Sequence, residues 1–228
     1  MELTATALWL NTTFAGFDGA ILKFMHALAE ALGFLLTPLM KLITLIGEKG
    51  LLFFLLAFVF MCFADTRKKG VCIFGAVCCG ALITNIILKD TVARPRPFEE
   101  VELFRQWWEF VGAPAEDGFS FPSGHVTAAA AGATALSLLY GKKLYIPSAV
   151  YVVLMAVSRN YLMAHYPTDV IFASLVGAAS GFIAYAITLF IYRVLEARRD
   201  IPLFAFVLEF DLPMPQLGKN SYKGKHER

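Results

Sequence analysis

Charged side chains are scarce in this sequence. Only 17% of the 228 residues are Asp, Glu, Lys or Arg, whereas 58% are hydrophobic, and a soluble domain carries about 25% charged residues. The mean hydropathy is +0.63. This composition argues against an ordinary soluble domain and predicts one helical membrane domain. The formal net charge of +2 gives no indication of nucleic-acid binding.

Clusters of metal-binding residues are also missing from the sequence. The four cysteines lie in apolar stretches, at Cys62, Cys72, Cys78 and Cys79. We interpret them as small buried hydrophobic residues, not as a disulfide framework. No group of carboxylates or cysteines offers a metal cage, so we expect neither a metal nor a cofactor. The first residues lack the basic segment and short apolar core of a cleavable signal peptide, and we expect none.

Long apolar runs are what the sequence contains instead. A transmembrane helix needs about 20 mostly apolar residues. Six segments approach that length, at roughly 19–46, 50–65, 70–88, 123–141, 144–162 and 168–192. We therefore expect an all-α fold, a six-helix membrane bundle over residues 1–192 with its core at 50–192. The front half of the first segment carries Lys23, His26 and Glu30, and an amphipathic helix at the membrane interface is the alternative there.

Basic loops indicate the orientation in the membrane. Positive residues accumulate in cytoplasmic loops. Three basic groups lie outside the expected spans, namely Arg67 with Lys68 and Lys69, Lys142 with Lys143, and Arg193 with Arg198 and Arg199. With six spans, these groups, both termini and a tail at 193–228 fall on the cytoplasmic side of a plasma or inner membrane. The remaining connections then face outward, at 47–49, 89–122 and 159–167.

The outer connection 89–122 begins with a run of cations. Lys89, Arg94 and Arg96 lie within eight residues, and a proline follows each arginine. Proline holds its neighbour in an extended backbone, and a rigid pair of guanidinium groups suits phosphate recognition. Cations at helix ends can also reach for lipid headgroups, and for this stretch alone that alternative stays open.

Two further polar stretches fall on the same face. Ser123 and Gly124 precede His125 at the start of an expected span, where the free N–H groups of a helix N-terminus favour an anion. In the other stretch, Asp169 follows His165 by four residues, so a carboxylate could fix the imidazole tautomer. Two histidines on opposite sides of a bound phosphate could transfer a phosphoryl group without a metal. A structural capping role is the alternative for each stretch alone.

Together, the three stretches resemble the type 2 phosphatidic acid phosphatase family, which shares its fold and site with the vanadium haloperoxidases. The family pattern Lys-x6-Arg-Pro matches residues 89–97, and Pro-Ser-Gly-His matches residues 122–125. The third pattern, Ser-Arg-x5-His-x3-Asp, matches residues 158–169. All three are complete and in order, and the resemblance covers about residues 50–192.

The resemblance implies a role for each matched residue. His165 would be the nucleophile that forms a phosphohistidine, Asp169 would orient it, and His125 would be the general acid. The remaining site residues would bind the phosphoryl oxygens, namely Lys89, Arg96, Ser123, Gly124 and Arg159. Arg94 lies outside the core pattern, and its assignment to the phosphate is open.

The implied reaction is metal-independent hydrolysis of a lipid phosphate or pyrophosphate at the outer membrane face. Undecaprenyl pyrophosphate, phosphatidylglycerol phosphate and phosphatidic acid all fit, with a slight preference for the first or a related phospholipid phosphate. The alternatives are a lipid phosphotransferase and a non-enzymatic membrane protein such as a transporter. The absence of polar residues midway along the expected spans argues against a transporter. The expected partners are the bilayer and the lipid substrate, with no nucleic acid; the oligomeric state is open.

A short amphipathic helix is expected within the outer connection. Between Glu99 and Val111, apolar residues that include Trp107 and Trp108 recur at helical spacing. Tryptophan favours the membrane interface. We hypothesise that this helix borders the lipid entrance, and simple anchoring is the alternative.

Overall fold

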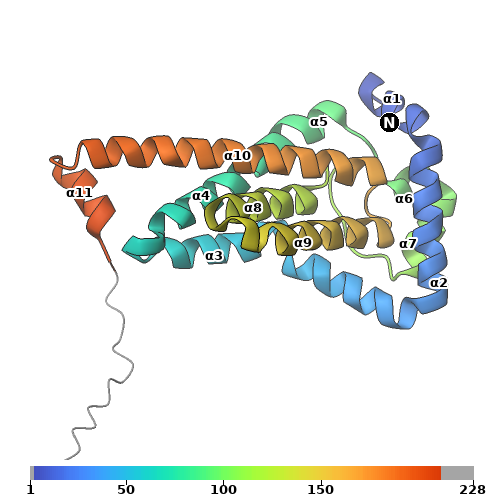
Figure 1. Cartoon of the computed structure of the whole chain (residues 1–228). Coiled ribbons are helices and arrows are strands. Elements are labelled where there is room, and N and C mark those ends of the chain that lie inside the picture. Colours follow the sequence, from blue (N-terminus) through green and yellow to red (C-terminus); the bar gives the residue numbers. More distant parts are fainter. Residues whose placement is uncertain (1–2, 212–228) are drawn as a thin grey trace, which may run out of the picture.

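The structure, a computed structural model, describes residues 3–211. Within that range every regular element is a helix, so the all-α expectation is confirmed. The bundle consists of five neighbouring helices (Figure 1), namely α3 (Leu51–Met61), α4 (Ala64–Ala81), α8 (Gly124–Tyr140), α9 (Lys142–Tyr161) and α10 (Pro167–Ala197). Large hydrophobic side chains point outward from this bundle, among them Phe58, Ile146, Leu175 and Phe190. Such an apolar exterior suits a lipid environment, and the protein is a membrane protein.

Small residues bring α8 and α10 close together. A Cβ atom added at Gly177 of α10 would lie 2.4 Å from the carbonyl oxygen of Thr127 in α8. One added at Gly181 would lie 2.7 Å from the Cβ atom of Thr134. Small residues permit such close contact between membrane helices. This packing fixes the first turns of α8 and α10 beside each other, where His125 and Asp169 lie.

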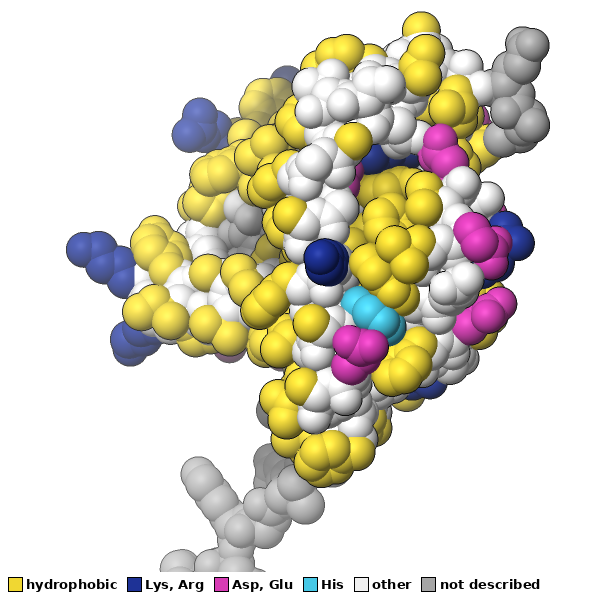
Figure 2. Space-filling view, turned by 90° about the vertical axis from the view of Figure 1, so that its right-hand side faces the viewer, with side chains coloured by type: hydrophobic (Ala, Val, Ile, Leu, Met, Phe, Trp, Pro, Cys, Tyr) yellow, Lys and Arg dark blue, Asp and Glu magenta, His cyan; other side chains and the backbone are white. Residues whose placement is uncertain are grey.

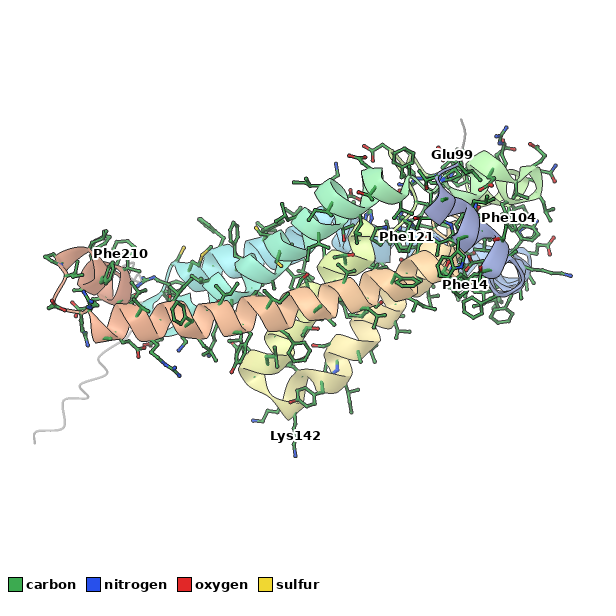
Figure 3. All side chains as sticks on the ribbon, turned by 90° about the horizontal axis from the view of Figure 1, so that it is seen from above. Phe14, Glu99, Phe104, Phe121, Lys142 and Phe210 are labelled. Carbon is green, nitrogen blue, oxygen red and sulfur yellow. The ribbon has the colours of Figure 1, made fainter. Side chains whose placement is uncertain are left out.

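The count of six crossings is not confirmed. Three stretches of helix in the described part of the chain are long and apolar enough to span a membrane, Ala15–Met61, Ala64–Glu100 and Pro167–Ala197. Helices α8 and α9 form a hairpin with Lys142 at its tip (Figure 3); α8 packs against α4 and α10, and α9 packs against α2.

The first two expected spans, 19–46 and 50–65, do not turn back on each other. The end of the first and the start of the second run in the same direction along the bundle. Helix α2 (Ala15–Ile46) bends at Leu32, where φ is −131°. Before the bend it runs across the end of the bundle, and after the bend it follows α9 (Figure 1). A short turn, η1 (Glu48–Gly50), then leads into α3, which continues in the same direction. Because α3 has only 11 residues and a crossing needs about 20, the segments 19–46 and 50–65 do not form two separate crossings. The alternative expectation for the front half of segment 19–46, an amphipathic helix at the membrane interface, agrees with this course.

The described ends of the chain lie at opposite ends of the bundle. Helix α1 (Ala5–Thr13) lies at one end and α11 (Pro202–Glu209) at the other (Figure 1). The expectation of two termini on one side followed from an even number of crossings, and that number is not confirmed. Arg67 of α4 donates to the carbonyl oxygens of Val207 and Phe210 and so holds α11. Residues 212–228 of the expected tail lie outside the described residues.

The end of the bundle near α1 holds the remaining short elements. These are η2 (Leu82–Leu88), which is a π-helix, α5 (Lys89–Val92), α6 (Pro97–Glu100) and α7 (Glu102–Phe110). Phe14, Glu99, Phe104 and Phe121 gather at this end, away from Phe210 (Figure 3). Viewed from this end, the surface mixes hydrophobic and acidic side chains (Figure 2). Such a mixture fits the headgroup region of a bilayer.

The expected amphipathic helix at 99–111 is present, although Val101 divides it into α6 and α7. Trp107 stacks on His26 of α2 with ring centroids 4.7 Å apart, and Trp108 stacks on Phe98 at 4.4 Å. Helix α7 therefore packs against the front half of α2.

Candidate active site

A cavity of about 580 Å³ lies among the first turn of α8, the η1 turn and the π-helix η2. It brings together five residues that the sequence predicted for the site, Lys89, Arg96, Gly124, His125 and His165. It also contains polar residues that the motifs did not include, namely Glu48, Lys49, Asn85, Glu116 and Asp117. None of the α7 residues lines this cavity, so the entrance hypothesis for Trp107 and Trp108 gains no support from it.

His165 lies in the tight connection between α9 and α10 and is 1% exposed. Its Nδ1 atom is 2.7 Å from the carbonyl oxygen of Ser120. Because a carbonyl only accepts hydrogen bonds, Nδ1 carries the proton and Nε2 keeps its lone pair. Burial and the nearby charges of Arg96 and Arg159 hold the pKa of His165 well below its ordinary value of 6.5. The imidazole is therefore neutral near pH 7, as a nitrogen nucleophile requires.

Asp169 acts on His165 through an intermediate residue. The expected direct contact is long, with 3.8 Å between His165 Nδ1 and Asp169 Oδ2. The same carboxylate oxygen instead accepts the Ser120 hydroxyl at 2.5 Å and the Tyr166 backbone N–H at 2.9 Å. Asp169 thus fixes Ser120, and the carbonyl oxygen of Ser120 fixes the imidazole.

Arg94 lies behind the site and not in the cavity. Its guanidinium group donates to Asp169 Oδ1 at 2.6 Å and to Asp18 Oδ2 at 2.8 Å. The Arg94 side chain is 1% exposed, and the ring of Tyr166 lies 3.8 Å from its central carbon. Because two carboxylates already compensate this charge, Arg94 organises the site and is not placed to contact a phosphate in the cavity.

A carboxylate bridges the two remaining arginines. Glu116 forms ion pairs with Arg159 and, at 3.1 Å, with Arg96. Burial alone would raise the pKa of the Glu116 carboxyl, but Arg159 and Arg96 outweigh it and hold that pKa below its ordinary value. Arg96 also donates to backbone carbonyl oxygens of the connection before α8, at Asp117 (2.7 Å) and Gly118 (2.9 Å). The arginine pair therefore already binds an anionic group with two oxygens.

The start of α8 supplies further donors. Ser123 occupies the expected N-cap position, but its hydroxyl makes no capping hydrogen bond. That hydroxyl and the Nε–H of Arg159 are both buried without a hydrogen-bond partner among residues 3–211. Buried polar groups in proteins are nearly always paired. Donors of this kind beside a cavity of cations fit an anion-binding site.

His125 follows Ser123 by two residues and faces the η1 turn. Its Nε2 atom is 3.1 Å from Glu48 Oε2. The motifs did not include Glu48, Glu116, Ser120 or Asp18. A signal existed for Asp18, because a carboxylate inside an apolar helix is costly and marks a functional or paired site.

Comparison with known proteins agrees with this arrangement. The sequence model of the PAP2 superfamily matches residues 69–193, which is more than half of the chain. The protein belongs to the PAP2 superfamily. The resemblance that the three motifs indicated is thereby confirmed.

Individual PAP2 relatives are moderately similar to this chain. The undecaprenyl-diphosphatase of Sulfolobus acidocaldarius is 30% identical over 125 residues, which span 55% of this chain and 58% of that protein. A crystallised PAP2-type phosphatidylglycerolphosphate phosphatase from Bacillus subtilis matches 80% of this chain and 90% of its own, with a TM-score of 0.62 and 24% identity. The structure of Aquifex aeolicus LpxE matches 72% of this chain and 93% of its own, with a TM-score of 0.54 and 26% identity. These structures share the fold.

Proposed function

We propose that this PAP2 protein hydrolyses a membrane lipid phosphate or pyrophosphate through a phosphohistidine intermediate. The observation that carries the proposal is the state of His165. Its Nδ1–H donates to the Ser120 carbonyl oxygen, and its Nε2 lies 3.5 Å from an Arg96 nitrogen, in a cavity that also contains His125. A neutral imidazole with its lone pair beside a cation matches what a nucleophile for a phosphoryl group needs.

The proposed reaction has two steps. In the first, the His165 Nε2 lone pair attacks phosphorus, the bond from phosphorus to the leaving oxygen breaks, and His125 gives that oxygen a proton. In the second, water attacks the phosphohistidine, His125 takes a proton from the water, and the P–N bond breaks. Both histidines return to their starting states, and phosphate is released.

Phosphate binding falls to the cationic residues in and beside the cavity and to α8. Lys89, Arg96 and Arg159 would hold the phosphoryl oxygens, with Ser123 and the Gly124 N–H as further donors. The Glu116 carboxylate contacts two of these cations. We expect the substrate phosphate to replace this carboxylate, because both are anions with oxygens that suit the same guanidinium groups.

The substrate is proposed from chemistry and relatives together. Apolar residues line the cavity beside the charged ones, namely Val77, Ala81 and Ala128. This composition suits a phosphate attached to a lipid. The Sulfolobus relative is an undecaprenyl-diphosphatase, which favours a polyprenyl pyrophosphate or a related phospholipid phosphate. The basic residues of the α3–α4 link, the α8–α9 hairpin and the end of α10 would face the cytoplasm, and the site would face outward.

Phosphate release by the detergent-purified protein tests the proposal. The panel consists of undecaprenyl pyrophosphate, phosphatidylglycerol phosphate and phosphatidic acid, each with EDTA, and His165→Ala is the control. We expect release by the wild type, none by the variant, and a ranking that identifies the substrate. Acceptor-dependent transfer without release would identify a phosphotransferase instead. No turnover of any lipid by folded protein would refute an enzymatic role.

A further inference from the structure

Glu48 is the carboxylate that contacts His125, and it lies outside the three sequence motifs. We propose that Glu48 is a positioning residue that orients His125 and favours the protonated form that a general acid needs. The inference rests on the proposed function, because it concerns the proton that the leaving oxygen receives.

The backbone around Glu48 is shaped to bring its side chain to the cavity. Lys49 has φ +48° and Gly50 has φ +76°, so two consecutive residues adopt left-handed conformations, which are unfavourable for a residue with a Cβ atom. A Cβ atom on Gly50 would also lie 2.9 Å from Val77 Cγ1. This turn separates the second half of α2 from α3 and places Glu48 opposite the first turn of α8. A continuous helix through residues 47–50 would not contain this turn.

The charges around His125 indicate how the Glu48 carboxylate affects protonation of the imidazole. Burial and the charge of Arg159 hold the pKa of His125 below its ordinary value of 6.5, whereas Glu48 and Glu116 act in the opposite direction. Glu116 is held by Arg96 and Arg159, so Glu48 is the carboxylate within hydrogen-bond distance of the ring. The other titratable groups that line the cavity are Lys49, Lys89, Arg96, Asp117 and His165. Three of these five, Lys49, Lys89 and Arg96, carry a positive charge, which makes a compensating carboxylate at His125 more important.

The contact also determines which proton moves. With the His125 Nε2–H held by Glu48, the proton available for the leaving oxygen is the one on Nδ1. After transfer, His125 is neutral with its proton on Nε2, and Nδ1 can accept a proton from water in the second step. Glu48 keeps its negative charge throughout.

A residue that supports a general acid matters most when the leaving group is poor. An alcohol released from a lipid phosphomonoester needs a proton as the P–O bond breaks, whereas a nitrophenolate needs little help. We therefore expect Glu48→Gln to lower kcat for short-chain phosphatidic acid by roughly 10- to 100-fold, within the usual contribution of general acid catalysis. The loss for para-nitrophenyl phosphate should be several times smaller. The basic limb of the kcat profile for the lipid should move to lower pH.

Three variants make the test specific. Glu109→Gln changes an exposed carboxylate on α7 and should leave both activities unchanged. Glu48→Asp keeps the charge and should retain more lipid hydrolysis than Glu48→Gln, and it provides a second comparison if Glu48→Gln is poorly folded. In a His125→Ala background, Glu48→Gln should cause no further loss, because the two residues act together.

The outcomes separate the inference from the proposed function. If Glu48→Gln lowers both activities equally and leaves the pH limb in place, or changes neither activity, the inference is wrong while the function stands. If the wild type hydrolyses neither these substrates nor any other lipid of the panel, the proposed function itself fails. An additional loss in the His125→Ala background would also overturn the pairing.

Discussion

Substitution of Asp18 tests the network of hydrogen bonds and ion pairs behind the site, because Asp18 connects the front half of α2 to α10. Its Oδ1 accepts the Thr168 backbone N–H at 2.9 Å. Its Oδ2 accepts the Thr168 hydroxyl and Arg94 Nη2, both at 2.8 Å. The residue is 2% exposed. In this position Asp18 accepts hydrogen bonds from the first turn of α10. It is also one of the two carboxylates that compensate the charge of Arg94.

The expected loss in Asp18→Ala follows from these contacts. Removing a helix cap costs about 1 kcal/mol. A buried donor left without a partner costs roughly 1–3 kcal/mol, and breaking a buried ion pair costs about 3–5 kcal/mol in total. We place Asp18→Ala at the lower end of that last range, because Asp169 still compensates Arg94. For a chain of this size, such a loss lowers the melting temperature by on the order of 10 °C.

Thermal unfolding in detergent measures this effect, with Asp90→Ala as the matched control. Asp90 is an exposed carboxylate on α5 at the same end of the molecule, so its removal should change the melting temperature little. Asp18→Asn should fall between the two variants, because its amide keeps one acceptor oxygen. Equal melting temperatures for Asp18→Ala and Asp90→Ala would refute the claim that this buried pair stabilises the protein.

Three further predictions concern the cavity and the packing beneath it. Glu116→Gln should strengthen inhibition by inorganic phosphate several-fold, because a neutral amide competes less for Arg159; a weaker inhibition would contradict the exchange of carboxylate for phosphate. The pKa of His165 is held below 6.5, so the imidazole becomes protonated only below that pH. The acid limb of the kcat/KM profile should therefore lie below pH 6.5, and an acid limb above pH 7 would contradict this. Gly177→Leu should lower both stability and activity far more than Gly16→Leu. Gly177 touches the α8 backbone, whereas no atom lies within 4 Å of a Cβ added at Gly16. Thermal unfolding and phosphate release compare the two variants.

That several of the candidate site residues lie together could be predicted from the sequence. His125, His165 and Lys89 lie in short motifs at helix ends, and a motif at a helix end keeps its local geometry whatever the remote parts of the chain do. Hydropathy identified the apolar segments, because their length and composition are local properties. Both kinds of signal extend over a few neighbouring residues.

The partners of the motif residues could not be predicted in the same way. Glu48 reaches His125 across 77 positions of sequence, and Asp18 reaches Thr168 across 150. No local pattern marks such pairs, since they depend on how helices pack. The course of α2 and α3 was missed for a related reason. Hydropathy finds apolar segments but does not say whether two short segments turn back or continue in line, as they do here around η1.

The distance in sequence between Asp18 and Thr168 has a consequence for how the protein is made. Synthesis proceeds from the N-terminus, so α2 emerges long before the 150 residues that separate Asp18 from its partner are complete. Until α10 arrives, neither Asp18 nor Arg94 has its full set of partners. His165 precedes α10 directly, and the carboxylate that holds Ser120 lies in its first turn. The proposed catalytic centre is therefore finished late, when the last long helix docks, and a nascent chain that stops before that helix carries an incomplete site.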